Sequence, residues 1–221
     1  MTNYHYWQYF LSLETDLITT SRYIEFSGVN NSTVHNNDKT FSTELLRIFL
    51  TACAECENIL KIILAKHDIT NLKDISQIKT SIRGIPLYRE LPNQIITCEA
   101  YNLKFTPWEA WNTSNKNSPQ WWQDHNAVKH GRANDTNSNY HLANVFNTLS
   151  SVAALMCLLF EYYKKRQDGD EGENVIKYRV ELPPTLAPKL FIPKESGLGY
   201  ADLGYGENWT WVWAPGAFGN T

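Results

Sequence analysis

The spacing of apolar residues divides the chain into long amphipathic helices separated by polar loops. We predict one helix over residues 3–26 and a second that is capped by Thr40 or Ser42 and ends near Lys66, where apolar residues recur at steps of four and three. Residues 68–83 carry a weaker helical pattern, and the most apolar helix is expected over residues 140–166. This order predicts an all-α fold.

Two segments interrupt the helical pattern. Residues 84–117 form a long excursion that begins with glycine and prolines, and its stretch 94–105 is β-branched and aromatic enough to be a strand or an extended crossing segment. Beyond the acidic linker 168–173, prolines and glycines recur too often for a long helix. Residues 178–182 and 209–213 alternate like short strands.

These patterns predict two parts, a helical domain over residues 1–167 and a linker and extended tail over residues 168–221. The tail is rich in aromatic side chains, which are unfavourable in water. We therefore expect it to fold back onto the helical body or onto a second subunit and to bury four aromatic residues: Phe191, Trp209, Trp211 and Trp213.

Composition and charge narrow the class of protein. The net charge of −3 argues against a protein that coats nucleic acid over its whole surface, but leaves a local basic site open. The apolar run 152–160 is about half of the roughly 20 residues that span a bilayer, so we expect a buried core helix and no membrane. Four irregularly spaced cysteines and an amino terminus without signal-peptide features favour the cytoplasm.

Polar chemistry is concentrated in residues 118–132. Ser118 is a suitable N-cap and Pro119 suits the first helical position, so we expect about three helical turns from Pro119 to Gly131. At helical spacing the stretch presents two neighbouring rows of side chains. They are Trp122, Asn126 and His130 in the first row, and Trp121, His125, Lys129 and Arg132 in the second.

Other chemistries fit the sequence poorly. Cys53 and Cys56 form a C-x-x-C in mid-helix without a second ligand pair, so core packing is the better interpretation. His125 and His130 are five residues apart, a poor spacing for two zinc ligands on one helix face. No glycine-rich phosphate loop or nucleophile elbow occurs. We expect neither a metal nor a cofactor.

The stretch His125 to His130 resembles the HEPN superfamily (higher eukaryotes and prokaryotes nucleotide-binding domains). In that family a late helix carries an arginine, then usually a polar residue such as asparagine, and a histidine a few positions later; Asn126 and His130 match this pattern. Residues 54–64 are similar to the family's Glu-x-x-x-Lys run. The resemblance covers about residues 3–166 and implies an up-and-down four-helix bundle.

Two positions depart from the family pattern. His125 stands where the family has arginine, and Arg132 stands where a tyrosine is frequent. The string Trp-Trp-x-x-His-Asn-x-Val-Lys-His-x-Arg looks more like an uncharacterised bacterial branch than like the well-defined toxin ribonucleases.

The resemblance implies RNA as the ligand and a metal-independent endoribonuclease as the activity, in a bacterial toxin or phage-defence system. His130 would be the base, Asn126 would orient it or the phosphate, and His125 would replace the arginine. Lys129 and Arg132 would bind the phosphate. The family forms its site across a homodimer, and a cognate antitoxin or defence partner would accompany it.

An inactive RNA-binding or protein-interaction module is the alternative. In it, His130 would belong to a buried structural cluster and bond to a carboxylate such as Glu55 or Glu57. A small-molecule sensor would need a pocket between helices. Two rows of Lys129 and Arg132 that face each other across a solvent-open dimer groove would favour nuclease action, whereas a buried cluster with no groove would favour a structural role.

Overall fold

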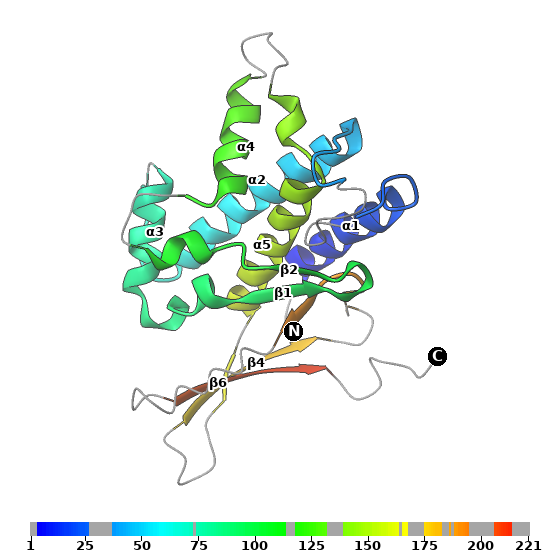
Figure 1. The fold of residues 1–221 in the computed structure, drawn as a ribbon. Helices are drawn as coiled ribbons and strands as arrows, with labels where there is room; N and C mark the ends of the chain where they lie inside the picture. The colour runs from blue at the N-terminus through cyan, green and yellow to red at the C-terminus, as the bar shows by residue number, and fades with distance from the viewer. Residues whose placement is uncertain are drawn as a thin grey trace.

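The described part of the chain, in a computed structural model, contains five α-helices, several one-turn 3-10 helices and six strands (Figure 1). The structure describes residues 4–26, 37–72, 74–113, 118–131, 139–163, 165–167, 175–182, 186, 188–194 and 206–213, and in the strands after residue 163 it describes the backbone only. The helices are α1 (His5–Thr20), α2 (Thr43–Ala65), α3 (Ile75–Gly84), α4 (Gln120–Gly131) and α5 (Val145–Tyr163). The predicted mainly helical class is confirmed.

The core lies where α2 and α5 pack along each other, with α1 and α4 against both. Ser42 caps α2, because its hydroxyl accepts a hydrogen bond from the Leu45 backbone N–H at 3.2 Å. The predicted apolar stripe of α2 is fully buried, including Phe49 and Cys56. Periodic apolar residues thus account for the way this helix packs.

Helix α5 is the buried centre of the fold. It is long and apolar enough to cross a membrane, but 89% of its most apolar 18-residue stretch is buried inside the protein. That burial is typical of the core helix of a soluble protein. Among the described residues, only the length and composition of α5 would suit a membrane span.

Two helices, α1 and α5, are shorter than the sequence predicted. α1 ends at Thr20 and continues only as turns to Ile24. α5 begins at Val145, because residues 140–142 form a 3-10 turn and the Asn144 side chain accepts from the Asn147 backbone N–H at 3.0 Å. At its other end α5 stops at Tyr163, short of the predicted residue 166, and residues 165–167 belong to a strand.

Strands occupy the excursion and the tail. β1 (Ile95–Cys98) pairs antiparallel with β2 (Leu103–Phe105) on one side and with β5 (Ile192–Lys194) on the other, which confirms the strand expected within residues 94–105. A second sheet joins β3 (Lys165–Gln167), β4 (Val175–Leu182) and β6 (Gly206–Trp213) and contains both predicted tail strands. The strands are thus organised into two three-stranded sheets.

Leu186 and residues 189–191 of the tail are hydrogen-bonded to α1. The buried Glu14 carboxylate accepts hydrogen bonds from three consecutive backbone N–H groups, those of Lys189, Leu190 and Phe191, at 2.9, 2.7 and 3.1 Å. The indole N–H of Trp7 donates to the Leu186 carbonyl at 2.7 Å. Phe191 is fully buried, as expected, whereas the side chains of the three tail tryptophans lie outside the described residues.

The cysteines pack as core residues. Cys53 and Cys56 are fully buried on α2, and the Cys56 thiol donates to the Ser151 carbonyl with a sulfur–oxygen distance of 3.8 Å. Burial raises the pKa of both thiols well above the ordinary value. Both positions therefore match the predicted packing role.

Candidate functional site

Helix α4 carries the predicted site residues and starts where the sequence indicates. The Pro119 carbonyl accepts the first helical hydrogen bonds, from the backbone N–H groups of Trp122 and Gln123 at 3.0 and 3.1 Å. The Gln123 amide also donates to the Ser118 carbonyl at 2.8 Å. The helix runs from Gln120 to Gly131, about one residue from the prediction.

Two tryptophans hold α4 against the body. The Trp121 indole N–H donates to the buried Pro107 carbonyl at 2.9 Å, and its ring meets that of Trp108 edge-on with centroids 5.2 Å apart. Trp122 is also buried. Because these contacts fix one face of α4 inward, the opposite face must carry its exposed polar groups.

A buried amide sets the position of α4 against α5. The Asn147 side chain donates to the Asp124 carboxylate at 2.7 Å and to the Leu142 carbonyl at 2.8 Å. The Gln120 amide donates to the other oxygen of Asp124 at 2.9 Å. Asp124 is therefore a structural carboxylate, which leaves the later turns of α4 to form the site.

Asn126, Lys129 and His130 line an open groove of about 320 Å³ between α2, α3 and α4. Figure 1 shows the arrangement of these three helices. We call this the α4 groove. Lys129 and His130 are exposed, whereas Asn126 is half-buried. Glu57 and Lys61 of α2 form the facing wall, and α3 closes one end with Asp74, Ile75 and Ile78.

Some charged side chains of the α4 groove are already paired with one another and others are not. Lys61 binds Glu57 at 2.5 Å, and this hydrogen bond, helped by the nearby Lys129, lowers the pKa of the Glu57 carboxyl. Asp74 caps α3 by accepting the Gln77 backbone N–H at 2.9 Å. Lys129 makes no salt bridge within the described residues, so its ammonium group is available to an anion.

His125 does not line the groove, although it is adjacent to residues that do. Its side chain is buried, with its ring 6.1 Å from that of Phe49 and 6.2 Å from that of Trp122, centroid to centroid. Burial, with a further contribution from Lys129, lowers the pKa of this imidazole, and Nδ1 is buried without a hydrogen bond to any described residue. A neutral, enclosed imidazole in this position does not reach a phosphate in the groove.

The structure therefore brings together three of the five predicted site residues: Asn126, Lys129 and His130. His125 is placed elsewhere, and Arg132 lies outside the described residues. Sequence reasoning assigned no site role to Lys61 or Asp74. The Glu57–Lys61 pair is the i, i+4 pair of the Glu-x-x-x-Lys run, but only packing places it opposite α4.

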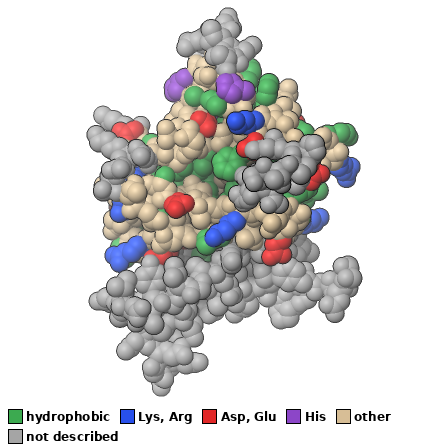
Figure 2. All heavy atoms as spheres, viewed as in Figure 1, with side chains coloured by type: hydrophobic (Ala, Val, Ile, Leu, Met, Phe, Trp, Pro, Cys, Tyr) green, Lys and Arg blue, Asp and Glu red, His purple; other side chains and the backbone are tan. Residues whose placement is uncertain are grey.

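The surface around the site is mixed in charge. Figure 2 shows basic and acidic side chains interspersed over the drawn face, with no extended basic area among its coloured residues. Within the parts of the chain that the structure covers, no three His, Cys, Asp or Glu side chains form a group that could hold a metal ion. The described residues on this face therefore offer no broad basic surface to an anion.

Comparison with known proteins yields no relative. No family model matches the chain, and no curated protein or solved structure matches it either.

Proposed function

We propose that this chain is a HEPN-like protein that binds RNA in the α4 groove and cleaves it without a metal ion. The observation that supports this best is the placement of Lys129 and His130, both exposed, beside Asn126 in an open groove. An exposed imidazole beside an unpaired ammonium group suits an RNA phosphate and its neighbouring ribose. The alternative in which His130 is enclosed in a structural cluster does not agree with its exposure.

In this proposal His130 removes the proton from a ribose 2′-OH. The oxygen attacks the adjacent phosphorus, the bond to the 5′-oxygen breaks, and a proton from solvent completes the leaving 5′-hydroxyl. A 2′,3′-cyclic phosphate remains on the other fragment. Lys129 stabilises the charge on the phosphate and Asn126 orients the reacting groups, with Arg132 as a further phosphate contact.

We further propose a homodimer in which two α4 grooves face each other. Among its described lining residues, one groove offers a single ammonium group without a salt bridge, since Lys61 is paired with Glu57. A second copy would double the cations around one phosphate. By the family resemblance the protein acts in the bacterial cytoplasm in a toxin or phage-defence system, with a cognate antitoxin or defence partner.

One observation favours a second candidate, an inactive RNA-binding or interaction module. His125 stands in the place of the family's arginine, but it is buried and its pKa is lowered, so it supplies no charge to the groove. Loss of that charge would weaken stabilisation of the transition state more than binding of RNA. The groove would then hold RNA without cleaving it.

Incubation of the protein with total RNA in chelator separates the candidates. Wild type should produce fragments with 2′,3′-cyclic phosphate ends, and His130→Ala should abolish them. His141→Ala is the matched control, because His141 is also exposed but lies on the turn before α5 and not in the groove. RNA binding by each variant is measured in parallel.

The outcomes are distinct. Cleavage that persists in His130→Ala would reject His130 as the base. Binding without cleavage in wild type, lost in Lys129→Ala, would establish the inactive module instead. Absence of both binding and cleavage would reject RNA as the ligand.

A further inference from the structure

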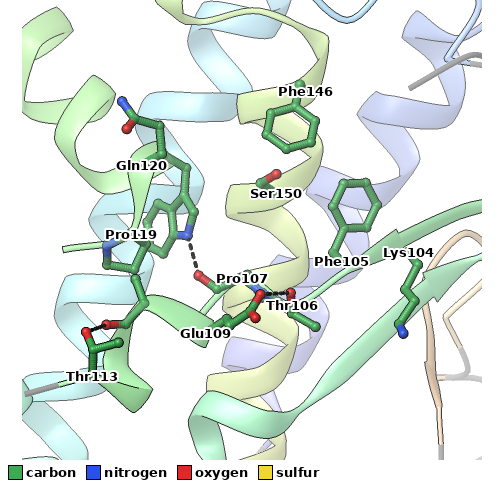
Figure 3. A pocket seen from close by; sticks show the side chains of 12 residues that line it. Lys104, Phe105, Thr106, Pro107, Glu109, Thr113, Pro119, Gln120, Phe146 and Ser150 are labelled. Carbon is green, nitrogen blue, oxygen red and sulfur yellow. Dashed lines mark hydrogen bonds between the residues drawn. The ribbon is translucent and has the colours of Figure 1, made fainter. Parts of the chain in front are cut away.

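A second cavity lies on another side of α4 from the groove. It is open, has a volume of about 480 Å³, and lies between the start of α4, the first turns of α5 and residues 104–113 (Figure 3). This volume is within the range of small-molecule sites in proteins. It shares no lining residue with the α4 groove. We call it the aromatic pocket.

Flat rings form much of its walls. Phe105 of β2 and Phe146 of α5 lie with centroids 6.3 Å apart, and Trp121 of α4 also lines the cavity. Figure 3 shows Phe146, Ser150 and Phe105 on one side and Pro119 and Gln120 on the other. Phe146 is 39% exposed, so an apolar ring faces solvent at the mouth of the cavity.

The Ser150 hydroxyl lies in this pocket without a hydrogen-bond partner among the described residues. The Thr106 hydroxyl donates to Glu109 at 2.8 Å, the Gln120 amide to Asp124, and the Trp121 indole N–H to Pro107. The Ser150 side chain lines the cavity, is only 5% exposed, and makes no hydrogen bond with the described residues. The residue as a whole is almost fully buried, but its hydroxyl is not one of the enclosed polar atoms and opens into the cavity, where a bound molecule can bond to it.

We propose that the aromatic pocket holds one unstacked nucleobase of a single-stranded RNA whose backbone lies in the α4 groove; this rests on the proposed function. A nucleobase offers a flat face for stacking on Phe146 and an edge that bonds to the Ser150 hydroxyl. An aliphatic or phenyl side chain of a protein partner would fill the walls but leave Ser150 unsatisfied. Adjacent residues of α4, Trp121 and Trp122, line the pocket and the groove, so one helix connects the two.

Substitution of Phe146 tests whether a base stacks on its ring. Binding of a short single-stranded 2′-O-methyl RNA, which cannot be cleaved through its 2′-oxygen, is measured in chelator for wild type, Phe146→Ala and Phe146→Leu. Loss of one stacked base should weaken the Kd roughly 5- to 150-fold in both variants. Tyr23→Ala is the control, because Tyr23 is an aromatic residue that is 85% exposed and does not line the pocket.

An abasic scan identifies the bound base. Replacing one nucleotide at a time by an abasic unit should weaken binding to wild type most at one position, and should have no further effect at that position in Phe146→Ala. Ser150→Ala should alter the preference for the base there while the thermal unfolding midpoint stays within a few degrees of wild type.

Three results would overturn the assignment. Wild-type affinity in Phe146→Ala, with affinity lost in Lys129→Ala, would reject the pocket and leave the proposed function standing. Wild-type affinity in Phe146→Leu alone would mean that an apolar contact suffices, as for a protein partner. No binding of any RNA by wild type would reject both proposals.

Discussion

Glu14 Oε1 accepts a hydrogen bond from the backbone N–H of Leu190 at 2.7 Å, although the two residues are 176 positions apart. The neighbouring N–H groups of Lys189 and Phe191 point at the same carboxylate. One side chain of α1 thus satisfies three backbone donors of the tail, which would otherwise need water.

Glu14→Gln should destabilise the protein by about 1–3 kcal/mol. The amide oxygen can replace Oε1, but the new NH₂ group would face the Lys189 N–H, so two donors would meet without an acceptor. The free energy of unfolding from urea titration measures the effect. Glu25→Gln, at an exposed carboxylate, should change it by less than about 0.5 kcal/mol. Equal losses in the two variants would contradict the role given to Glu14.

Stability should fall on acidification because of His125. Its folded pKa is lowered below 6.5, so the unfolded chain binds the proton first, and stability is lost as pH falls from about 6.5 toward the lowered value. The loss relative to His125→Phe, which keeps a ring between Phe49 and Trp122, should approach about 1 kcal/mol per pH unit within that window. Urea titrations from neutral to mildly acidic pH measure this difference.

A matched variant at exposed His141, His141→Gln, controls for the loss of one histidine. It should retain the wild-type dependence on pH. The assignment to His125 is wrong if His125→Phe loses stability on acidification as steeply as wild type.

Asn147→Ala should destabilise the contact between α4 and α5 by about 2–3 kcal/mol, because two buried hydrogen bonds are lost and one of them is to a carboxylate. Gln120→Ala removes the other donor to Asp124 at an exposed position and should cost less than about 0.5 kcal/mol. Chemical denaturation of both variants gives the comparison. A cost in Gln120→Ala as large as that in Asn147→Ala would mean that burial is not what matters here.

Lys129→Ala should weaken RNA binding and reduce its dependence on salt. If Lys129 contacts one phosphate, the slope of log K against log salt should become less steep by about 0.7 for a single strand. Lys39→Ala, at an exposed lysine that lines neither the groove nor the aromatic pocket, is the control. An unchanged slope in Lys129→Ala would show that this lysine does not meet the RNA backbone.

Periodicity was sufficient to predict the helices and one face of the site. Lys129 and His130 follow Asn126 by three and four residues, so an α-helix brings both side chains next to that of Asn126 on its surface. The two tryptophans and Val128 bury the other side of α4, which determines that this surface faces outward. The sequence therefore indicated the three residues that α4 contributes to the groove, but not those of α2 and α3.

Long-range packing could not be predicted in the same way. His125 belongs to the same row as Lys129, but it is one turn closer to Trp121 and is enclosed by Phe49 of α2. The facing wall of the groove comes from residues about 70 positions earlier, and the Glu14 contacts join α1 to the tail. Such contacts depend on how elements meet, which hydrophobic periodicity does not encode.

The pairing of β5 with β1 also bears on association between copies of the protein. In the sheet order β2-β1-β5, β5 is an outer strand of three residues, and its central residue, Pro193, lies opposite Ile96. Proline has no N–H to offer to an incoming strand, and so short an outer strand presents few other backbone groups. This edge therefore resists the strand-to-strand pairing that leads to aggregation.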